Sequence, residues 1–304
     1  MMDLGRLRAL HAVSTHGSVH EAALALHVTT SAVSQQLGKL EREIGQRLIE
    51  RNGRGVRLTD AALLLADHAD RILAQVEEAR SDLEAARGGV RGHVTLGGFA
   101  SSARGIAPSA LCALRDRYPD VTVELRELEM EDSIPMLVRG DLDVAMVNDW
   151  DTEPLPIADG IVRAPLLDDV FDLVLPAGHR LAGQAEVDLA EMDGEAWIGW
   201  TKDSMCNKWL ARTLRGLGIE PAIKHTVEDH HTQMTLVAAG LGSALLPRIG
   251  RPIPTDDVRV VELRPSLTRH IYAITRKGAT RRPAIRAVRD ALRDVSHPLG
   301  KRPE

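Results

Sequence analysis

Small polar and amide side chains near the N-terminus have the chemistry needed to read DNA. Ser31, Gln35 and Arg42 are spaced for one helix face, about 200° from the apolar face that carries Val33 and Leu37. Hydroxyl, amide and guanidinium groups on an exposed helix can hydrogen bond to base edges. The spacing favours a helix that enters the major groove of DNA, although the solvated face of an ordinary helical bundle would show the same pattern.

Three arginines follow around a glycine-rich turn. Arg51, Arg54 and Arg57 alternate with Gly53 and Gly55 in a segment that is typical of two short strands joined by a turn. Arginines on such a hairpin can contact phosphates or the minor groove without reading much sequence. The segment is therefore predicted to be a DNA-binding wing, with a solvated turn as the alternative.

Two further helices must position the recognition helix. Apolar spacing predicts a helix over residues 4–15, and Ser18 with Glu21 forms the pattern of a capping box that starts a second helix at Val19. Thr29 can cap the third helix after a short connection. Two helices joined by a tight turn, the second with polar residues facing outwards, are typical of a helix-turn-helix.

A long helix without glycine or proline is predicted next, followed by a glycine-rich break at residues 88–92 that can act as a hinge. We expect its apolar seam to pack against the same helix of a second copy of the chain, because a helix of roughly 42 Å extends well beyond a small domain. Packing along the chain's own C-terminal domain is the alternative. The seam alternates steps of four and three, as in a coiled coil, through Leu65, Ala69, Ile72, Val76, Ala79, Leu83 and Ala86.

Beyond the hinge, short apolar strands alternate twice with helical segments, which predicts an α/β domain of two lobes. The whole chain is thus expected to combine an all-α winged helix-turn-helix and a long linker helix with this α/β domain. The predicted divisions are 1–59 for the winged helix-turn-helix, 60–87 for the linker helix, 88–92 for the hinge and 93–304 for the lobes, the first lobe holding 93–163 and 268–304 and the second 164–267.

Charge is distributed unevenly along the chain. Residues 1–59 hold 8 Lys/Arg and 5 Asp/Glu, whereas the net charge of the whole chain is -5. The N-terminal region is therefore the positive end, which is compatible with DNA binding there. No long apolar run or signal-peptide pattern occurs, so a cytoplasmic protein without a membrane partner is expected.

The spaced N-terminal residues resemble the DNA-binding signature of the LysR-type transcriptional regulators. The C-terminal region resembles the same family more loosely, in the same order. The matching positions are residues 17–23, 26–29, 32–37, 40–41, 45, 48, 51 and 58–61, then Tyr118-Pro119, 140–145, 240–242 and 246–247.

This resemblance implies a sequence-specific regulator that binds partly palindromic double-stranded DNA. It implies a homodimer, commonly paired into a homotetramer, and two periplasmic-binding-protein-like subdomains that hold a small-molecule effector. No cofactor is expected. Thr30-Ser31 stands where the family usually has Gln-Pro, Gly38 replaces a longer residue and Ala62 replaces the usual glycine. The residues expected to contact DNA are Thr30, Ser31, Ser34, Gln35, Lys39, Arg51, Arg54 and Arg57.

An effector of such a fold binds between the lobes, where strands end and helices begin. Hydroxyl groups there suit an anionic or carboxylate effector, and Trp200 can cover an apolar body. The alternatives are that the serines only cap a helix and that Trp200 is core. The expected effector-binding residues are Ser101, Ser102 and Ala103, which match the family's ligand loop, and Trp200, Thr201, Val227, Asp229 and His230 of the second lobe.

Metal and redox chemistry have less support in the sequence. His225, Asp229, His230 and His231 are ligating residue types, but they lack the spacing of a known metal site. Solvated loop residues, or a histidine that titrates near neutrality, are the preferred interpretation. The two cysteines match no zinc or redox motif, so two structural thiols are expected.

An enzyme and a solute-binding protein are the two alternatives from other functional classes. No catalytic motif occurs, so an enzyme is not expected. A solute-binding protein would share the two lobes but would carry a signal peptide and no helix-turn-helix. The remaining alternative is a DNA-binding regulator without an effector, whose C-terminal domain serves only oligomerisation.

Overall fold

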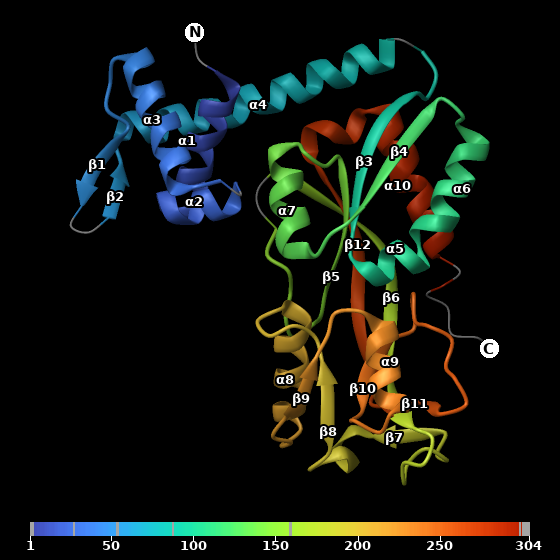
Figure 1. Ribbon diagram of the computed structural model, residues 1–304. Helices are drawn as coiled ribbons and strands as arrows, with labels where there is room; N and C mark the ends of the chain where they lie inside the picture. The colour runs from blue at the N-terminus through green and yellow to red at the C-terminus, as the bar shows by residue number, and fades with distance from the viewer. Residues whose placement is uncertain are drawn as a thin grey trace.

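The chain forms a small N-terminal domain, a long helix and a C-terminal domain of two lobes (Figure 1). The computed structural model describes residues 3–26, 28–52, 55–86, 88–157, 160–297 and 299. In Figure 1 the long helix runs from the N-terminal domain, in blue, across the top of the first lobe, and the second lobe lies below.

The N-terminal domain is a bundle of the three predicted helices, α1 (Leu4–His16), α2 (Val19–Ala25) and α3 (Thr30–Ile44). Ser18 Oγ accepts a hydrogen bond from the backbone nitrogen of Glu21 at 3.0 Å, and Thr29 Oγ1 accepts one from that of Ala32 at 3.1 Å. Both predicted N-caps are thereby confirmed. The apolar faces share one core, in which the following residues are at most 2% exposed: Leu7, Leu10, Val13, Ala22, Val33, Leu37 and Leu40.

A hairpin of β1 (Ile49–Asn52) and β2 (Gly55–Leu58) follows α3, as expected of a wing. Its antiparallel register pairs Ile49 with Leu58 and Asn52 with Gly55. The hairpin leads directly into α4 (Asp60–Ala86), whose first turn is capped by Thr59, since Thr59 Oγ1 accepts a hydrogen bond from the backbone nitrogen of Ala62 at 3.2 Å.

The expectation that the whole α4 seam faces a second copy is wrong for its first half. Leu65, Ala69 and Ile72 pack in the core of the N-terminal domain, and Ala69 is fully buried. The physical reason is that α1 lies along this stripe. An apolar period shows that a helix face is covered, but not which element covers it.

The first lobe is an α/β layer structure. Its parallel strands β3 (Gly92–Gly98), β4 (Val121–Glu127) and β5 (Val144–Asp149) lie in the order β4-β3-β5. Two helices, α6 (Ala107–Arg117) and α10 (Pro283–Ser296), share a core on one face of this sheet. The residues that flank α5 (Ala100–Gly105), Phe99 and Ile106, belong to the same core. The helix α7 (Met130–Arg139) packs on the other face.

Two long antiparallel strands connect the lobes. The strands β6 (Ile161–Pro176) and β12 (Leu267–Arg276) pair from Ile161 with Arg276 to Phe171 with Leu267. The prediction identified only the second part of β6 as a strand. Since both strands belong to both lobes, the sheet is continuous through the middle of the C-terminal domain (Figure 1).

The second lobe contains short strands around the far end of β6. The helices α8 (Met205–Gly216) and α9 (His230–Ala238) lie at the predicted places, whereas β7 and β11 were not predicted. The strand β7 has only three residues, too few to show a period of two. The remaining elements are β7 (Glu186–Asp188), η1 (Leu189–Met192), β8 (Ala196–Gly199), β9 (Ala222–Thr226), β10 (Ala244–Pro247), β11 (Val258–Arg264) and, back in the first lobe, η2 (Lys277–Arg281).

Candidate DNA interface and effector site

The exposed face of α3 carries the polar residues predicted to read DNA. Val33, Leu37 and Leu40 are at most 1% exposed and hold the opposite face in the core. The helix is therefore fixed by packing while its polar side chains project freely, which is the arrangement that major-groove readout requires. The predicted residues that the structure places on this exposed face are Thr30, Ser31, Ser34, Gln35 and Lys39.

The wing is attached to this helix by Glu41. Its Oε1 accepts hydrogen bonds from the backbone nitrogens of Leu48 at 2.7 Å and Ile49 at 3.2 Å. Arg57 on β2 is exposed, as expected for a phosphate contact. Arg54 and the side chain of Arg51 lie outside the described residues.

The predicted effector loop after β3 forms α5, and its two serines are buried. Ser101 and Ser102 are 2% and 0% exposed. Ser102 Oγ donates to the carbonyl oxygen of Phe99 at 2.8 Å, and Ser101 Oγ accepts from Nη2 of Arg269 at 2.7 Å. Ser101 thus has a charged partner within the protein.

Arg269 is the centre of a buried cluster where the lobes meet. Its Nε and Nη2 donate to Oδ2 of Asp169 at 3.0 and 2.8 Å, and both side chains are at most 4% exposed. The guanidinium also lies 5.0 Å from the ring centroid of Phe99 and 5.4 Å from that of Phe171, at which range a cation is attracted to an aromatic face. The cluster joins α5 of the first lobe to both crossing strands.

Further polar contacts cross between the lobes. Arg104 of α5 donates from Nε to the carbonyl oxygen of Gly250 at 3.1 Å and lies 3.5 Å from Asp229. On another side, Glu131 of α7 accepts from the backbone nitrogen of Met205 at 3.3 Å. The lobes are therefore in contact in this conformation.

Glu129 carries the strongest electrostatic perturbation among the acidic residues of this region. Part of the residue's surface is exposed, but protein atoms surround the carboxylate and reduce its solvation. This desolvation, followed by repulsion from Glu228 and Glu131, raises the pKa of Glu129 to about 7. Glu228 belongs to the second lobe and holds the backbone nitrogen of Thr201 at 2.8 Å. Acidic groups of both lobes therefore approach each other here, which the expectation of an anionic or carboxylate effector did not anticipate.

The predicted residues of the second lobe differ in exposure. Trp200 is 4% exposed and belongs to the apolar core of that lobe, whereas Thr201 and Asp229 are exposed. Val227 is partly buried and packs against a neighbouring core, and Ala103 in the first lobe is also partly buried. In this conformation Trp200 is core, the alternative noted from the sequence.

His230 is buried beside Trp200, with ring centroids 6.3 Å apart. Burial, followed by repulsion from Arg269 and Arg104, lowers its pKa to about 3. The expectation of a solvated histidine or one that titrates near neutrality is therefore wrong for His230, because burial disfavours the charged imidazolium.

Sequence reasoning missed Asp169 and Arg269 of the buried cluster where the lobes meet. It also missed Asn148 on the neighbouring strand, which lies opposite Ile271, two residues from Arg269 on β12. Asn148 is 1% exposed at the end of β5, and its Nδ2 has no hydrogen-bond partner among the described residues. A buried amide donor without a partner is costly, and a bound acceptor group would satisfy it. The available signal was polar or charged residues inside otherwise apolar strands, as at Arg269.

Neither cysteine forms a disulfide. Cys112 is exposed on α6, whereas burial raises the pKa of the Cys206 thiol on α8 to about 12. Among the described residues no group of three or more His, Cys, Asp or Glu side chains is arranged to hold a metal ion. Within the same residues, no helix combines the length and apolar character needed to cross a membrane.

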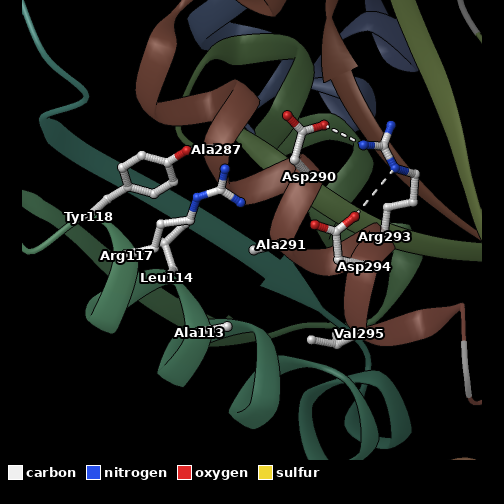
Figure 2. A pocket seen from close by; sticks show the side chains of 10 residues that line it. All are labelled: Ala113, Leu114, Arg117, Tyr118, Ala287, Asp290, Ala291, Arg293, Asp294 and Val295. Atoms are coloured by element: carbon white, nitrogen blue, oxygen red, sulfur yellow. Dashed lines mark hydrogen bonds and ion pairs between the residues drawn. The ribbon is translucent and has the colours of Figure 1, made fainter.

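A separate groove of about 310 Å³ lies between α6 and α10 (Figure 2). Leu114, Ala291 and Val295 contribute apolar surface, and Arg117 and Asp290 contribute charges. None of the predicted effector residues lines this groove. It is therefore distinct from the contact region between the lobes.

Family models match both parts of the chain. The bacterial regulatory helix-turn-helix protein model of the lysR family matches residues 4–63, and the LysR substrate binding domain model matches residues 87–296. Winged helix-turn-helix and two-lobed domain together define a DNA-binding transcription regulator. The chain belongs to the LysR family of such regulators.

Individual relatives are similar over nearly the whole chain. The regulator ShiR of Corynebacterium glutamicum is 28% identical over 300 residues, covering 97% of this chain and 98% of the relative. The small neutral protease regulatory protein of Streptomyces coelicolor is 32% identical over 270 residues, covering 85% and 81%.

Solved structures share the fold. Full-length OxyR from Pseudomonas aeruginosa has a TM-score of 0.63 at 22% identity and covers 99% of this chain and 100% of its own. CbnR in complex with its target DNA has a TM-score of 0.57 at 23% identity, with coverage of 97% and 100%.

Proposed function

We propose that this LysR-type regulator binds a partly palindromic operator through the exposed face of α3 and the wing, and that a small molecule bound between the C-terminal lobes controls it. It acts in the cytoplasm as a homodimer, which pairs into a tetramer. The observation that carries the proposal is the combination of a fixed helix with a free polar face and two lobes that meet around Ser101 and Arg269.

The side chains of α3 and of the wing contact different parts of the DNA in this proposal. Gln35 has the donor and acceptor pair that matches an adenine edge, and Ser31 and Ser34 are short enough to let the helix approach the groove. Lys39 and Arg57 supply charge for phosphates, which positions the protein on the duplex.

The groups between the lobes favour an effector with at least one acceptor group. Asn148 offers an unsatisfied buried amide donor, and the guanidinium of Arg269 is held by Ser101 and Asp169. A carboxylate or carbonyl that satisfied Asn148 and competed with Asp169 for Arg269 would bind there. Polar effectors with donor groups would in addition meet the acidic side chains of Glu129 and Glu228.

DNA footprinting of the full chain tests this function. The operator is sought in the DNA between the chain's own gene and its neighbour, with and without small carboxylates and amines, and binding of each compound is followed by the shift of the unfolding temperature. An effector should raise that temperature and change the footprint. Ser101→Ala should weaken the response, while Ser109→Ala, an exposed serine of α6, should not.

A regulator without an effector is the second candidate. The footprint would then be unchanged by every compound, while Gln35→Ala would still weaken selective protection of the operator. Occupation of Ser101 by Arg269 within the protein is the observation that favours this candidate.

A further inference from the structure

The second half of α4 lies directly on the first lobe. At Gly278 of η2 a β-carbon would stand only 2.9 Å from Cβ of Glu77 and 3.4 Å from the carbonyl oxygen of Ala74. Glu77 and Ser81 are 8% and 1% exposed. The linker helix is thus packed against the regulatory domain over two turns, in addition to its covalent connection through residues 88–92.

Five charged side chains hold this contact. Arg282 donates from Nε to both carboxylate oxygens of Glu84 at 2.9 Å and from Nη1 to Oδ1 of Asp143 at 2.6 Å. Nη2 of Arg276 lies 3.5 Å from Oδ1 of Asp143 and 3.6 Å from Oε2 of Glu77. Glu77 and Glu84 are seven residues apart and therefore share one face of α4.

This network, which we term the linker latch, is shielded from water. The side chains of Glu77, Asp143, Arg276 and Arg282 are between 10% and 14% exposed, and that of Glu84 is 25% exposed. Salt screens such groups weakly, and removal of one partner leaves an uncompensated charge. The latch therefore favours one position of α4 on the lobe over others.

Both arginines of the latch are fixed within the lobe. Nη1 of Arg276 donates to the carbonyl oxygens of Leu137 at 2.6 Å and Leu142 at 2.5 Å, around the end of α7. Asp143 also accepts from the backbone nitrogen of Thr95 on β3 at 3.1 Å. The lobe presents a rigid receptor, and α4 supplies only the two glutamates.

One strand joins the latch to the contact region between the lobes. Arg269 and Arg276 lie seven residues apart on β12, roughly 24 Å at the rise of a β-strand. The strand is hydrogen bonded to β5 on one side and β6 on the other. The register with β6 shifts between Ile271 and Tyr272, whereas the pairing with β5 is unbroken from His270 to Thr275. A shift at Arg269 can therefore be carried to Arg276 along the paired strands β12 and β5.

We propose that the linker latch couples the contact region between the lobes to the direction of α4. When Arg269 moves, β12 carries Arg276, and the latch makes α4 follow, which redirects the DNA-binding domain. Residues 88–92 then provide the covalent connection and the latch provides the coupling. That this coupling regulates DNA binding rests on the proposed function. The movement of α4 with β12 can be measured in the absence of DNA and effector.

Distances between spin labels test whether the latch fixes α4. The labels are placed at His68→Cys on α4 and Ser109→Cys on α6, both exposed positions, in a full chain whose natural cysteines are replaced by serine and which is diluted with unlabelled chains. Glu77→Gln combined with Glu84→Gln should broaden the distance distribution at least about twofold. Asp82→Asn, an exposed carboxylate of the same helix, should not. An unchanged distribution in the double variant overturns the latch.

The coupling is tested by combining changes at the two ends of β12. Arg269→Lys, or the milder Ser101→Ala, should shift the mean distance in the latched chain and should not shift it in the Glu77→Gln, Glu84→Gln background. Equal shifts in both backgrounds, or no shift in either, overturn the coupling, because linked sites must be non-additive. Should Glu77→Gln impair folding, Glu84→Gln alone gives the same test at the more exposed residue.

These measurements separate the latch from the proposed function. If the labelled chain shows the coupling but binds no operator, the function fails and the latch stands. If the chain binds an operator and the distance distribution of α4 is the same in every variant, the proposed linker latch is wrong and the proposed function is retained.

Discussion

Gly105 of α5 and Gly250 after β10 touch across the two lobes with no room for a side chain on either. A β-carbon at Gly105 would stand 2.7 Å from the backbone nitrogen of Gly250 and 2.6 Å from Cγ1 of Ile249. At Gly250 it would collide with the backbone of Ser101, and this glycine also has a φ of +63°, which other residues rarely adopt. The contact lies one residue from Arg104, whose Nε donates to the carbonyl oxygen of Gly250. The backbones themselves thus define how closely the lobes meet.

Gly250→Ala should disturb this contact. We expect a loss of about 1–3 kcal/mol in the free energy of unfolding, because the backbone is strained and the new methyl group overlaps the Ser101 carbonyl. Urea unfolding of the full chain measures it. Gly178→Ala, where the new methyl group meets open space, is the control. Equal stability of the two variants would contradict the described contact.

Glu129→Gln should stabilise the protein only at high pH. The pKa of Glu129 is raised to about 7 from an ordinary value of 4.5, so its contribution to stability is present below the ordinary value and is lost as pH rises through about 7. The variant should have the higher urea midpoint at about pH 8 and no advantage near pH 4.

Asp256→Asn is the control, because Asp256 is an exposed carboxylate of the second lobe and is not among the groups that raise the pKa of Glu129. It should change the midpoint little across the same pH range. A Glu129→Gln advantage that was the same at every pH would show that the carboxylate of Glu129 is not perturbed by its neighbours.

Cys206 should react slowly with electrophiles and peroxide. Its pKa is raised to about 12 by burial, and only the thiolate is an effective nucleophile. We expect the folded chain to be labelled by iodoacetamide at exposed Cys112 first, with Cys206 slower by roughly a hundredfold or more at neutral pH. Mass spectrometry of the labelled peptides decides this, and comparable rates at both cysteines would indicate a reactive thiol.

Gln35→Ala and Lys39→Ala should weaken DNA binding in different ways. Loss of the Gln35 amide should cost about 1–3 kcal/mol on the operator and little on unrelated DNA, because the amide reads a base. Loss of Lys39 should weaken both and lower the slope of affinity against salt by about one. Gln184→Ala, an exposed glutamine of the second lobe, should change neither.

The recognition helix was predictable because its chemistry is local. Val33 and Leu37 define the buried face by their period, and Ser31 and Gln35 must then face outwards. The N-termini of the second and third helices and the turn of the wing were predictable from capping residues and glycines that are close to them in the sequence.

The cluster between the lobes was not predictable for the opposite reason. Arg269 and Ser101 are 168 residues apart, and their hydrogen bond depends on how two lobes and a crossing strand assemble. A hydroxyl after a strand indicates a binding loop, but it does not show that a guanidinium of the same chain reaches it first. The prediction for the apolar seam of α4 was wrong for a similar reason, since Ala69 packs in the core of the N-terminal domain, where α1 lies against α4.

Fluorescence anisotropy with labelled DNA tests the central claim most directly. The full chain is titrated against the DNA between its own gene and its neighbour, and against a shuffled sequence of the same composition, at two salt concentrations. Binding to the first should be at least about a thousandfold tighter than to the second and should weaken as salt rises. Equal affinity of the folded protein for both sequences, whatever the salt, would contradict a sequence-reading role for the exposed face of α3.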